Sequence, residues 1–434
     1  MSPTHTDTPF KRVLGVRSIA AGSFNGIVGV GIFGLPALIA GVLGPAAILA
    51  YLVCIILIAL VGLCLAEAGS RVSEAGGLYA YARAAYGPVV SGVAGVLLLI
   101  ANAAASSAAL ARLLVDTLAE VWAPAGTPLV ATLILGGLYA ALAIINIRGV
   151  REGAGATRIF AMLKLVPLVI LIAVGAIMIR PVNLHWTVTP SPETIGHASV
   201  LLIFAFVGVE TGLGTGGEAR DPARTIPRAI LLALATVAAL YIGLQVVAQG
   251  VLGPALATSS TPLVAVAVAI FGAPAAGAMV ALTLVSGTGY LVADMLSSPR
   301  TAFTLAGAGQ LPRALTRVHP RYATPSVAIL AYSALAFLLA ASGSFKQLVL
   351  LISSGTLILY LICCLGVLRL RKRGVAMAGE PFRAPGGALV PLAAAALIVA
   401  LLSTLAWAET AAALGLVAVS AAIYALIDRR RQRG

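Results

Sequence analysis

A series of long apolar stretches constrains this chain more than any other feature. About 20 apolar residues suffice for a helix to cross the hydrocarbon of a bilayer. The chain is 60% hydrophobic and 10% charged, with a mean hydropathy of +1.06, so it has too little polar surface for a soluble globule. The sequence therefore predicts an all-α polytopic membrane protein. Its 12 transmembrane helices are expected at about 18–42, 45–68, 89–115, 128–147, 159–179, 196–218, 229–250, 263–298, 325–342, 346–368, 388–406 and 409–427.

The basic residues predict the orientation. The formal net charge is +14, and lysine and arginine concentrate in alternate loops. This is the positive-inside bias of a polytopic protein in the cell membrane, and we expect no nucleic-acid partner. An even number of spans places both terminal tails, 1–17 and 428–434, in the cytoplasm. Residues 1–10 are polar and the first apolar run is too long for a cleavable signal peptide.

Other chemistries have little support. The four cysteines lie in apolar runs without paired histidines, so we expect no disulfide framework, metal site or cofactor. Four scattered histidines and no paired nucleophile argue against an enzyme. A channel would need a continuous file of polar side chains, which spans 3, 7 and 10 do not supply. Residues 67–88, too polar to cross the membrane, predict a short surface helix with Tyr79, Tyr81 and Tyr86 at headgroup depth.

Two glycine-rich stretches interrupt the apolar pattern. Residues 22–36 (GSFNGIVGVGIFGLP) lie in the first span, and residues 204–217 (FAFVGVETGLGTGG) lie in the sixth. Glycine in membrane helices often only allows close packing. Interrupted segments at matching positions of two halves, however, point to the midplane binding site of an inverted-repeat transporter.

Five motifs occur in order along the chain: GVGIFGLPA in the first span, LAEAGSRVSEAGGLYAYARAAYGP after the second, FAFVGVE and GEARDPARTIPRAI around the sixth, and GQLPRALTRVHPRYATP before the ninth. With these motifs the chain resembles amino acid, polyamine and organocation (APC) transporters over nearly its whole length. The resemblance implies a 5+5 inverted repeat with broken helices 1 and 6. The repeats would cover 18–179 and 196–368, with two appended spans at 388–427.

In similar transporters the two breaks hold the backbone of an amino acid. Amides at Gly29 to Gly31 would receive the carboxylate at the positive end of a helix dipole. Carbonyls at the ends of the first half-helices, 25–27 and 204–207, would accept from the ammonium group. Val30 stands where many relatives carry a hydroxyl residue, so the amides must serve alone. Phe204 lies where relatives have an aromatic gate, although a lipid-facing or core position is the alternative.

Two polar residues in other spans leave alternatives open. Asn102 either lines the pocket or joins packed helices. Asp294 either favours a substrate with a second positive charge or pairs with Arg300 or a serine. The candidate substrate-binding residues are Ile27, Gly29, Val30, Gly31, Asn102, Phe204, Ala205, Val207, Gly208 and Asp294.

Two ionisable residues are candidates for coupling. Lys164 lies inside the fifth span, where a lysine costs about 2.5 to 3.5 kcal/mol on insertion scales. In similar transporters such a lysine replaces a sodium ion, which implies sodium-independent transport; the alternative is snorkelling to the interface. Glu210 matches an acidic residue of relatives, with either a coupling or a structural role.

The sequence thus predicts a sodium-independent secondary transporter of amino acids that uses alternating access, as a proton symporter or an exchanger. The alternatives are an antiporter of cationic amino acids or polyamines, and an amino acid sensor that does not transport. Expected partners are the amino acid, membrane lipid and protons, in a monomer or homodimer.

Overall fold

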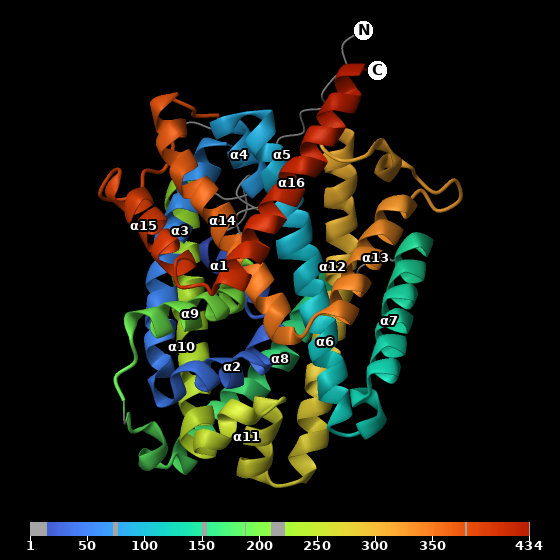
Figure 1. Cartoon of the computed structure of the whole chain (residues 1–434). Helices are drawn as coiled ribbons and strands as arrows, with labels where there is room; N and C mark the ends of the chain where they lie inside the picture. Colours follow the sequence, from blue (N-terminus) through green and yellow to red (C-terminus); the bar gives the residue numbers. More distant parts are fainter. Residues whose placement is uncertain are drawn as a thin grey trace.

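The described part of the chain is helical throughout. A computed structural model describes residues 15–72, 77–149, 154–186, 188–209, 222–377 and 380–433, and no strand occurs among them. The longer helices run roughly along one axis, with α4 and the end of α16 at the same end of the molecule (Figure 1). The α-helices are α1 (Val16–Ile27), α2 (Leu35–Leu43), α3 (Ile48–Arg71), α4 (Leu78–Tyr86), α5 (Pro88–Leu97), α6 (Ala105–Ala119), α7 (Pro128–Arg148), α8 (Ala154–Gly175), α9 (Pro192–Ile203), α10 (Pro222–Leu252), α11 (Pro262–Phe271), α12 (Pro274–Gly307), α13 (Ser326–Ser342), α14 (Phe345–Lys372), α15 (Leu389–Leu402) and α16 (Trp407–Arg433).

Length and composition identify a polytopic membrane protein. Seven helical segments within the described residues are long and apolar enough to cross a bilayer, and several shorter apolar helices accompany them. Their outer faces carry exposed large hydrophobic side chains, such as Leu129 and Leu133 on α7. The inner face of the same helix buries Tyr139. An apolar surface of this kind suits contact with lipid. The seven segments are Leu35–Arg71, Pro88–Ala119, Pro128–Arg148, Arg224–Thr258, Pro274–Gly307, Phe345–Lys372 and Trp407–Ile427.

The first apolar stretch is interrupted as predicted. Helix α1 ends at Ile27, a single 3₁₀ turn η1 (Val30–Phe33) follows, and α2 begins only at Leu35. The sixth stretch also loses its α-helix at the predicted place. Helix α9 ends at Ile203 and continues as the 3₁₀ turn η7 (Phe204–Phe206), while residues 210–221 lie outside the described part.

The expected span at 263–298 is wrong. It consists of two helices, α11 and α12, which pack against each other across a tight turn. Gly272 adopts φ +82°, which ends α11, and Pro274 starts α12. The hydropathy pattern does not reveal this turn, because its sequence, FGAP, is as apolar as the helices around it.

The predicted surface helix is present as α4, but the expected position of Tyr81 is wrong. Its side chain is only 5% exposed. A Cβ built on Gly69 of α3 would lie 2.8 Å from the Tyr81 hydroxyl, so the tyrosine is packed against that glycine. Tyr81 therefore anchors α4 to the end of α3 and does not lie among lipid headgroups.

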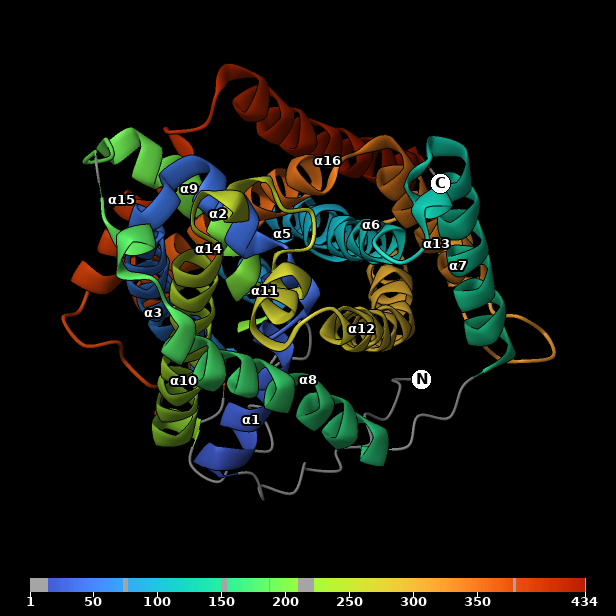
Figure 2. The same cartoon turned by 90° about the horizontal axis from the view of Figure 1, so that it is seen from below.

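The helices form two groups when seen from below (Figure 2). Helices α1, α3, α9 and α10 gather on one side, and α6, α7, α12 and α13 on the other. Within the first group α10 packs against α1 and α3; within the second, α13 packs against α6, α7 and α12. Turn η1 of the broken first stretch contacts α12, which joins the two groups.

Candidate functional site

The break between α1 and η1 opens the backbone at two residues. Val28 has ψ 76° and Gly29 is extended, with ψ −167°. The Gly29 amide folds back and donates to the Ile27 carbonyl at 2.7 Å, so it is already engaged. The first amides of a helix have no partner within that helix. The backbone amides of Val30 and Gly31, at the start of η1, are therefore the ones placed to receive an anion.

The second break lies against the first. Gly208 follows η7 with φ +104°, a conformation that favours glycine. A Cβ built on Gly208 would lie 2.5 Å from the carbonyl oxygen of Gly26 and 2.9 Å from its carbon. Both the backbone angle and the close approach require glycine here. The structure thus brings residue 208 and the end of α1 into direct contact.

A tyrosine of α10 connects the two breaks. The Tyr241 side chain is fully buried, and its hydroxyl lies 3.1 Å from the Ile27 carbonyl oxygen and 3.1 Å from that of Ala205. Its ring meets that of Phe206 edge-on, with 5.6 Å between centroids. Because a phenol has one hydrogen, the two carbonyls share a single donor. These are carbonyls expected to accept from an ammonium group.

Tyr241 was missed in the sequence. A buried tyrosine hydroxyl usually finds a hydrogen-bond partner, so a tyrosine inside the apolar run of α10 was the available signal. The hydropathy pattern does not reveal which carbonyls it reaches, because Ile27 is 214 residues away.

Phe204 covers the first break. A Cβ built on Gly31 would lie 2.8 Å from the Phe204 ring, so the ring rests directly on that glycine. The ring also meets Phe345 of α14 edge-on, with centroids 6.2 Å apart. Five candidate residues are therefore gathered at one place: Ile27, Gly31, Phe204, Ala205 and Gly208. Val207, with ψ 136°, lies in the same unwound segment.

Asn102 and Asp294 make other contacts. Asn102 lies in a π-helical turn, η3 (Leu98–Ala104), and its side-chain amide donates to the Thr356 hydroxyl of α14 at 3.4 Å. Asp294 accepts hydrogen bonds from Ser298 and Tyr332 at 2.6 Å each. The Arg300 guanidinium instead donates to the Leu296 carbonyl. Arg300 or a serine was the expected partner of Asp294, and the structure shows a serine, Ser298.

The coupling candidates lie at the limits of the described part. The backbone of Lys164 belongs to α8, which packs against α10 and α12, but its side chain is outside the described atoms. The same holds for the side chain of Val30. Glu210 lies outside the described residues altogether. The roles of Lys164 and Glu210 remain predictions.

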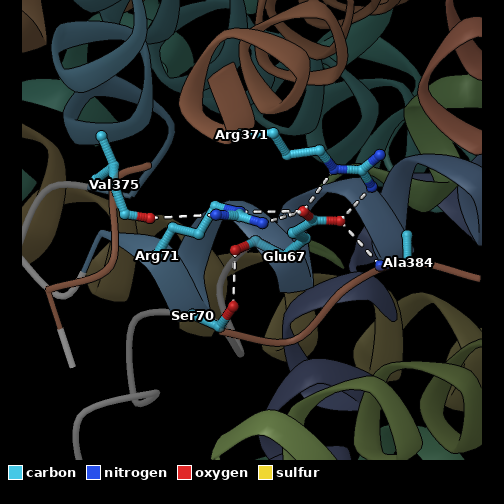
Figure 3. Close-up of polar contacts among 6 residues, drawn as sticks. All are labelled: Glu67, Ser70, Arg71, Arg371, Val375 and Ala384. Atoms are coloured by element: carbon cyan, nitrogen blue, oxygen red, sulfur yellow. Dashed lines mark hydrogen bonds and ion pairs between the residues drawn. The ribbon is translucent and has the colours of Figure 1, made fainter. Parts of the chain in front are cut away.

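A buried ion cluster lies at the end of α3 (Figure 3). The Glu67 side chain has no exposed surface. Its Oε1 accepts from Arg71 Nε at 3.0 Å and Arg371 Nε at 2.8 Å, and its Oε2 from Arg371 Nη2 at 2.6 Å and the Ala384 amide at 2.8 Å. The cluster fastens α3 to α14 and to the segment before α15. Its partners are up to 317 residues apart, so no local pattern in the sequence predicts the cluster.

The helices and the paired breaks define a class: a polytopic, all-helical membrane protein whose first apolar stretch opens its backbone inside the protein. Comparison with known proteins agrees. The sequence profile of the amino acid permease family matches residues 14–427, and the chain belongs to that family. Its relatives are amino acid permeases of the APC group, as the sequence motifs predicted.

Individual relatives are distant in sequence but match most of this chain. The chain is 24% identical to the branched-chain amino acid permease BcaP of Bacillus subtilis, over 100% of this chain and 96% of the relative. It is 31% identical to an uncharacterized transporter of Mycobacterium bovis, over 83% of this chain and 81% of the relative. It is 28% identical to mouse cationic amino acid transporter 4, over 88% of this chain and 63% of the relative. These relatives are transporters and not enzymes.

Proposed function

We propose that this protein is a sodium-independent secondary transporter that carries amino acids across the cell membrane by alternating access, as a proton symporter or an exchanger. The observation that carries the proposal is the contact between the two opened backbones, at Gly208 and Gly26, under the bridging hydroxyl of Tyr241. Membership of the amino acid permease family supports the substrate class.

The proposed site matches both ends of a zwitterion. A buried charge without a partner costs several kcal/mol, so the carboxylate and the ammonium each need a dipole. The carboxylate would bind the amides of Val30 and Gly31 at the start of η1. The ammonium would take the carbonyls of Ile27 and Ala205, displacing the Tyr241 hydroxyl from at least one of them.

The proposed motion separates the two groups of helices. Spans 1, 2, 6 and 7, represented by α1, α3, α9 and α10, rock against spans 3, 4, 8 and 9, represented by α6, α7, α12 and α13. The packing of these helices into two groups supports this division. We propose 12 spans in a 5+5 inverted repeat, with both termini in the cytoplasm.

Sodium independence rests on Lys164. We propose that its ammonium group occupies the place of a sodium ion beside the opened first span, and that Glu210 of the sixth span is the second coupling residue. Replacing Lys164 by glutamine removes this charge and is the direct check on this part of the proposal. The readout is the effect of external sodium, because uptake by a sodium-coupled carrier rises with external sodium.

Counterflow in proteoliposomes tests the transport function. Vesicles preloaded with an unlabelled branched-chain amino acid should accumulate labelled substrate transiently, whereas empty vesicles should not. Screening neutral, acidic and basic amino acids in this assay defines the preference. A protein that binds amino acids with no trans-stimulated uptake of any of them is a sensor, and the proposal is then wrong.

Replacing Tyr241 by phenylalanine is expected to slow transport. The change leaves the Ala205 carbonyl without its donor in the substrate-free protein, which costs about 1 to 3 kcal/mol for a buried acceptor. Release of the substrate restores this state and therefore becomes slower. Substrate uptake should fall about tenfold or more.

Tyr51 supplies the control for Tyr241. Its buried hydroxyl bonds to the side chain of Gln245 at 3.1 Å and not to an opened backbone. Phenylalanine at position 51 should lower thermal stability to a similar degree but affect uptake less. Equal uptake by the two variants would remove Tyr241 from the site.

A further inference from the structure

Asp294 lies in a cluster of hydroxyl groups that joins four helices. Its side chain comes from α12, and the residue is 8% exposed. Ser298 donates to Oδ1 and Tyr332 of α13 donates to Oδ2, each at 2.6 Å. Ser107 of α6 lies near enough to the carboxylate to stabilise its charge, and Tyr139 of α7 donates to the Ser107 hydroxyl at 3.2 Å.

No described lysine or arginine side chain forms an ion pair with Asp294. Around it, α6 contributes Ser107, α7 Tyr139 and α13 Tyr332, while α12 itself contributes Ser298, Tyr290 and Arg300. The Arg300 guanidinium is directed to the carbonyl of Leu296. On α8, which also packs against α12, the side chains from Ala154 to Lys164 lie outside the described atoms.

Two other carboxylates, the buried Glu67 and the half-buried Asp116, have different partners. Glu67 is held by two arginines and an amide, which can only donate. Asp116 pairs with Arg112 at 3.1 Å. Those surroundings satisfy only the ionised form. Hydroxyls can both donate and accept, so the neighbours of Asp294 satisfy either form by rotating.

We propose that Asp294 reversibly binds the proton that this transporter carries with its substrate. The inference rests on the proposed transport function. An ionised carboxylate without a cation is costly to bury. The O–H bond therefore forms at the carboxylate when the protein is open to the acidic side of the membrane, and it breaks when the protein is open to the other side. When the proton arrives, the hydroxyl of Tyr332 or Ser298 turns from donor to acceptor.

The location links Asp294 to the substrate site through α12. The cluster joins α6, α7, α12 and α13, which form one packed group, and α12 contacts η1 at the first break. A change in hydrogen bonding at Asp294 therefore acts on the helix that touches the opened backbone. This role differs from the recognition of a second positive charge on the substrate, because both carboxylate oxygens already have protein partners.

The experiment compares the wild-type protein, Asp294→Asn, Asp116→Asn and Lys164→Gln in proteoliposomes. An inward proton gradient should accelerate uptake by the wild type and by Asp116→Asn. In Asp294→Asn the acceleration should disappear, and counterflow should no longer vary with pH. Wild-type acceleration in Asp294→Asn would overturn the proposal. Loss of the acceleration only in Lys164→Gln would overturn it as well, since the proton would then belong to Lys164.

An infrared measurement tests proton binding without transport. The difference spectrum between acidic and alkaline pH should contain a carboxylic acid C=O band that Asp294→Asn lacks and Asp116→Asn retains. An unchanged band in Asp294→Asn overturns the proposal. Should the wild type show no counterflow, the transport function fails, and the band still decides whether Asp294 binds a proton.

A second variant keeps the carboxylate in case the asparagine does not fold. Tyr332→Phe removes one donor to the ionised form, so the pH midpoint of uptake and of the infrared band should rise by about one unit or more. An unshifted midpoint in a folded Tyr332→Phe protein would contradict the proposal.

Discussion

Alanine at position 208 is expected to abolish most transport. Its Cβ would lie 2.5 Å from the Gly26 carbonyl oxygen, and φ +104° is unfavourable for any residue with a Cβ. The backbone angle costs about 1 to 2 kcal/mol, and forced overpacking adds about 1 to 3 kcal/mol. The colliding atoms belong to backbone, which cannot rotate away. The opened ends must therefore move apart, and uptake should fall at least about thirtyfold.

Gly277 provides the matched control for this substitution. It lies on α12 with nothing within 4 Å of a built Cβ. Alanine there should leave both uptake and thermal stability at the wild-type level, as is usual for exposed positions without special contacts. Normal uptake by the Gly208 variant would mean that the two breaks can separate without consequence, and the proposed site would lose its main support.

Glutamine at position 67 is expected to cause the largest loss of stability. It removes the negative charge from a fully buried carboxylate and leaves Arg71 and Arg371 facing a neutral amide. Breaking a buried ion pair from one side costs about 3 to 5 kcal/mol, because the remaining charge is left without compensation. Thermal unfolding of the purified protein in detergent measures the loss.

Glu120 is the control for Glu67. Its carboxylate accepts from the exposed hydroxyl of Ser260 at 2.8 Å, and glutamine there should change stability by less than about 0.5 kcal/mol. Added salt should not reproduce the Glu67 effect, since buried pairs are screened far less than exposed ones. Equal unfolding temperatures for wild type and the Glu67 variant would show that the cluster contributes no net stability.

The features predicted correctly from the sequence are those that depend on local chemistry. Hydropathy indicated a polytopic helical membrane protein, and the motifs indicated the permease family, which the family comparison confirms. The glycines of the first stretch predicted its interruption, because a helix end at Ile27 followed by an extended Gly29 is a property of neighbouring residues.

The features that were missed depend on contacts between distant parts of the chain. Tyr241 reaches Ile27 across 214 residues, and Glu67 reaches Arg371 across 304. No periodicity in the sequence encodes such partners. The turn between α11 and α12 was missed for a different reason, since hydropathy does not distinguish an apolar turn from an apolar helix.

The segment between α14 and α15 has a practical consequence for work with this protein. A loop of this kind is an ordinary choice for inserting an epitope or a fluorescent label. Here the Met377 amide donates to the Arg71 carbonyl, and the Ala384 amide donates to Glu67. A label placed between these residues would pull both attachments away from α3, whereas one placed after α16 would leave them intact.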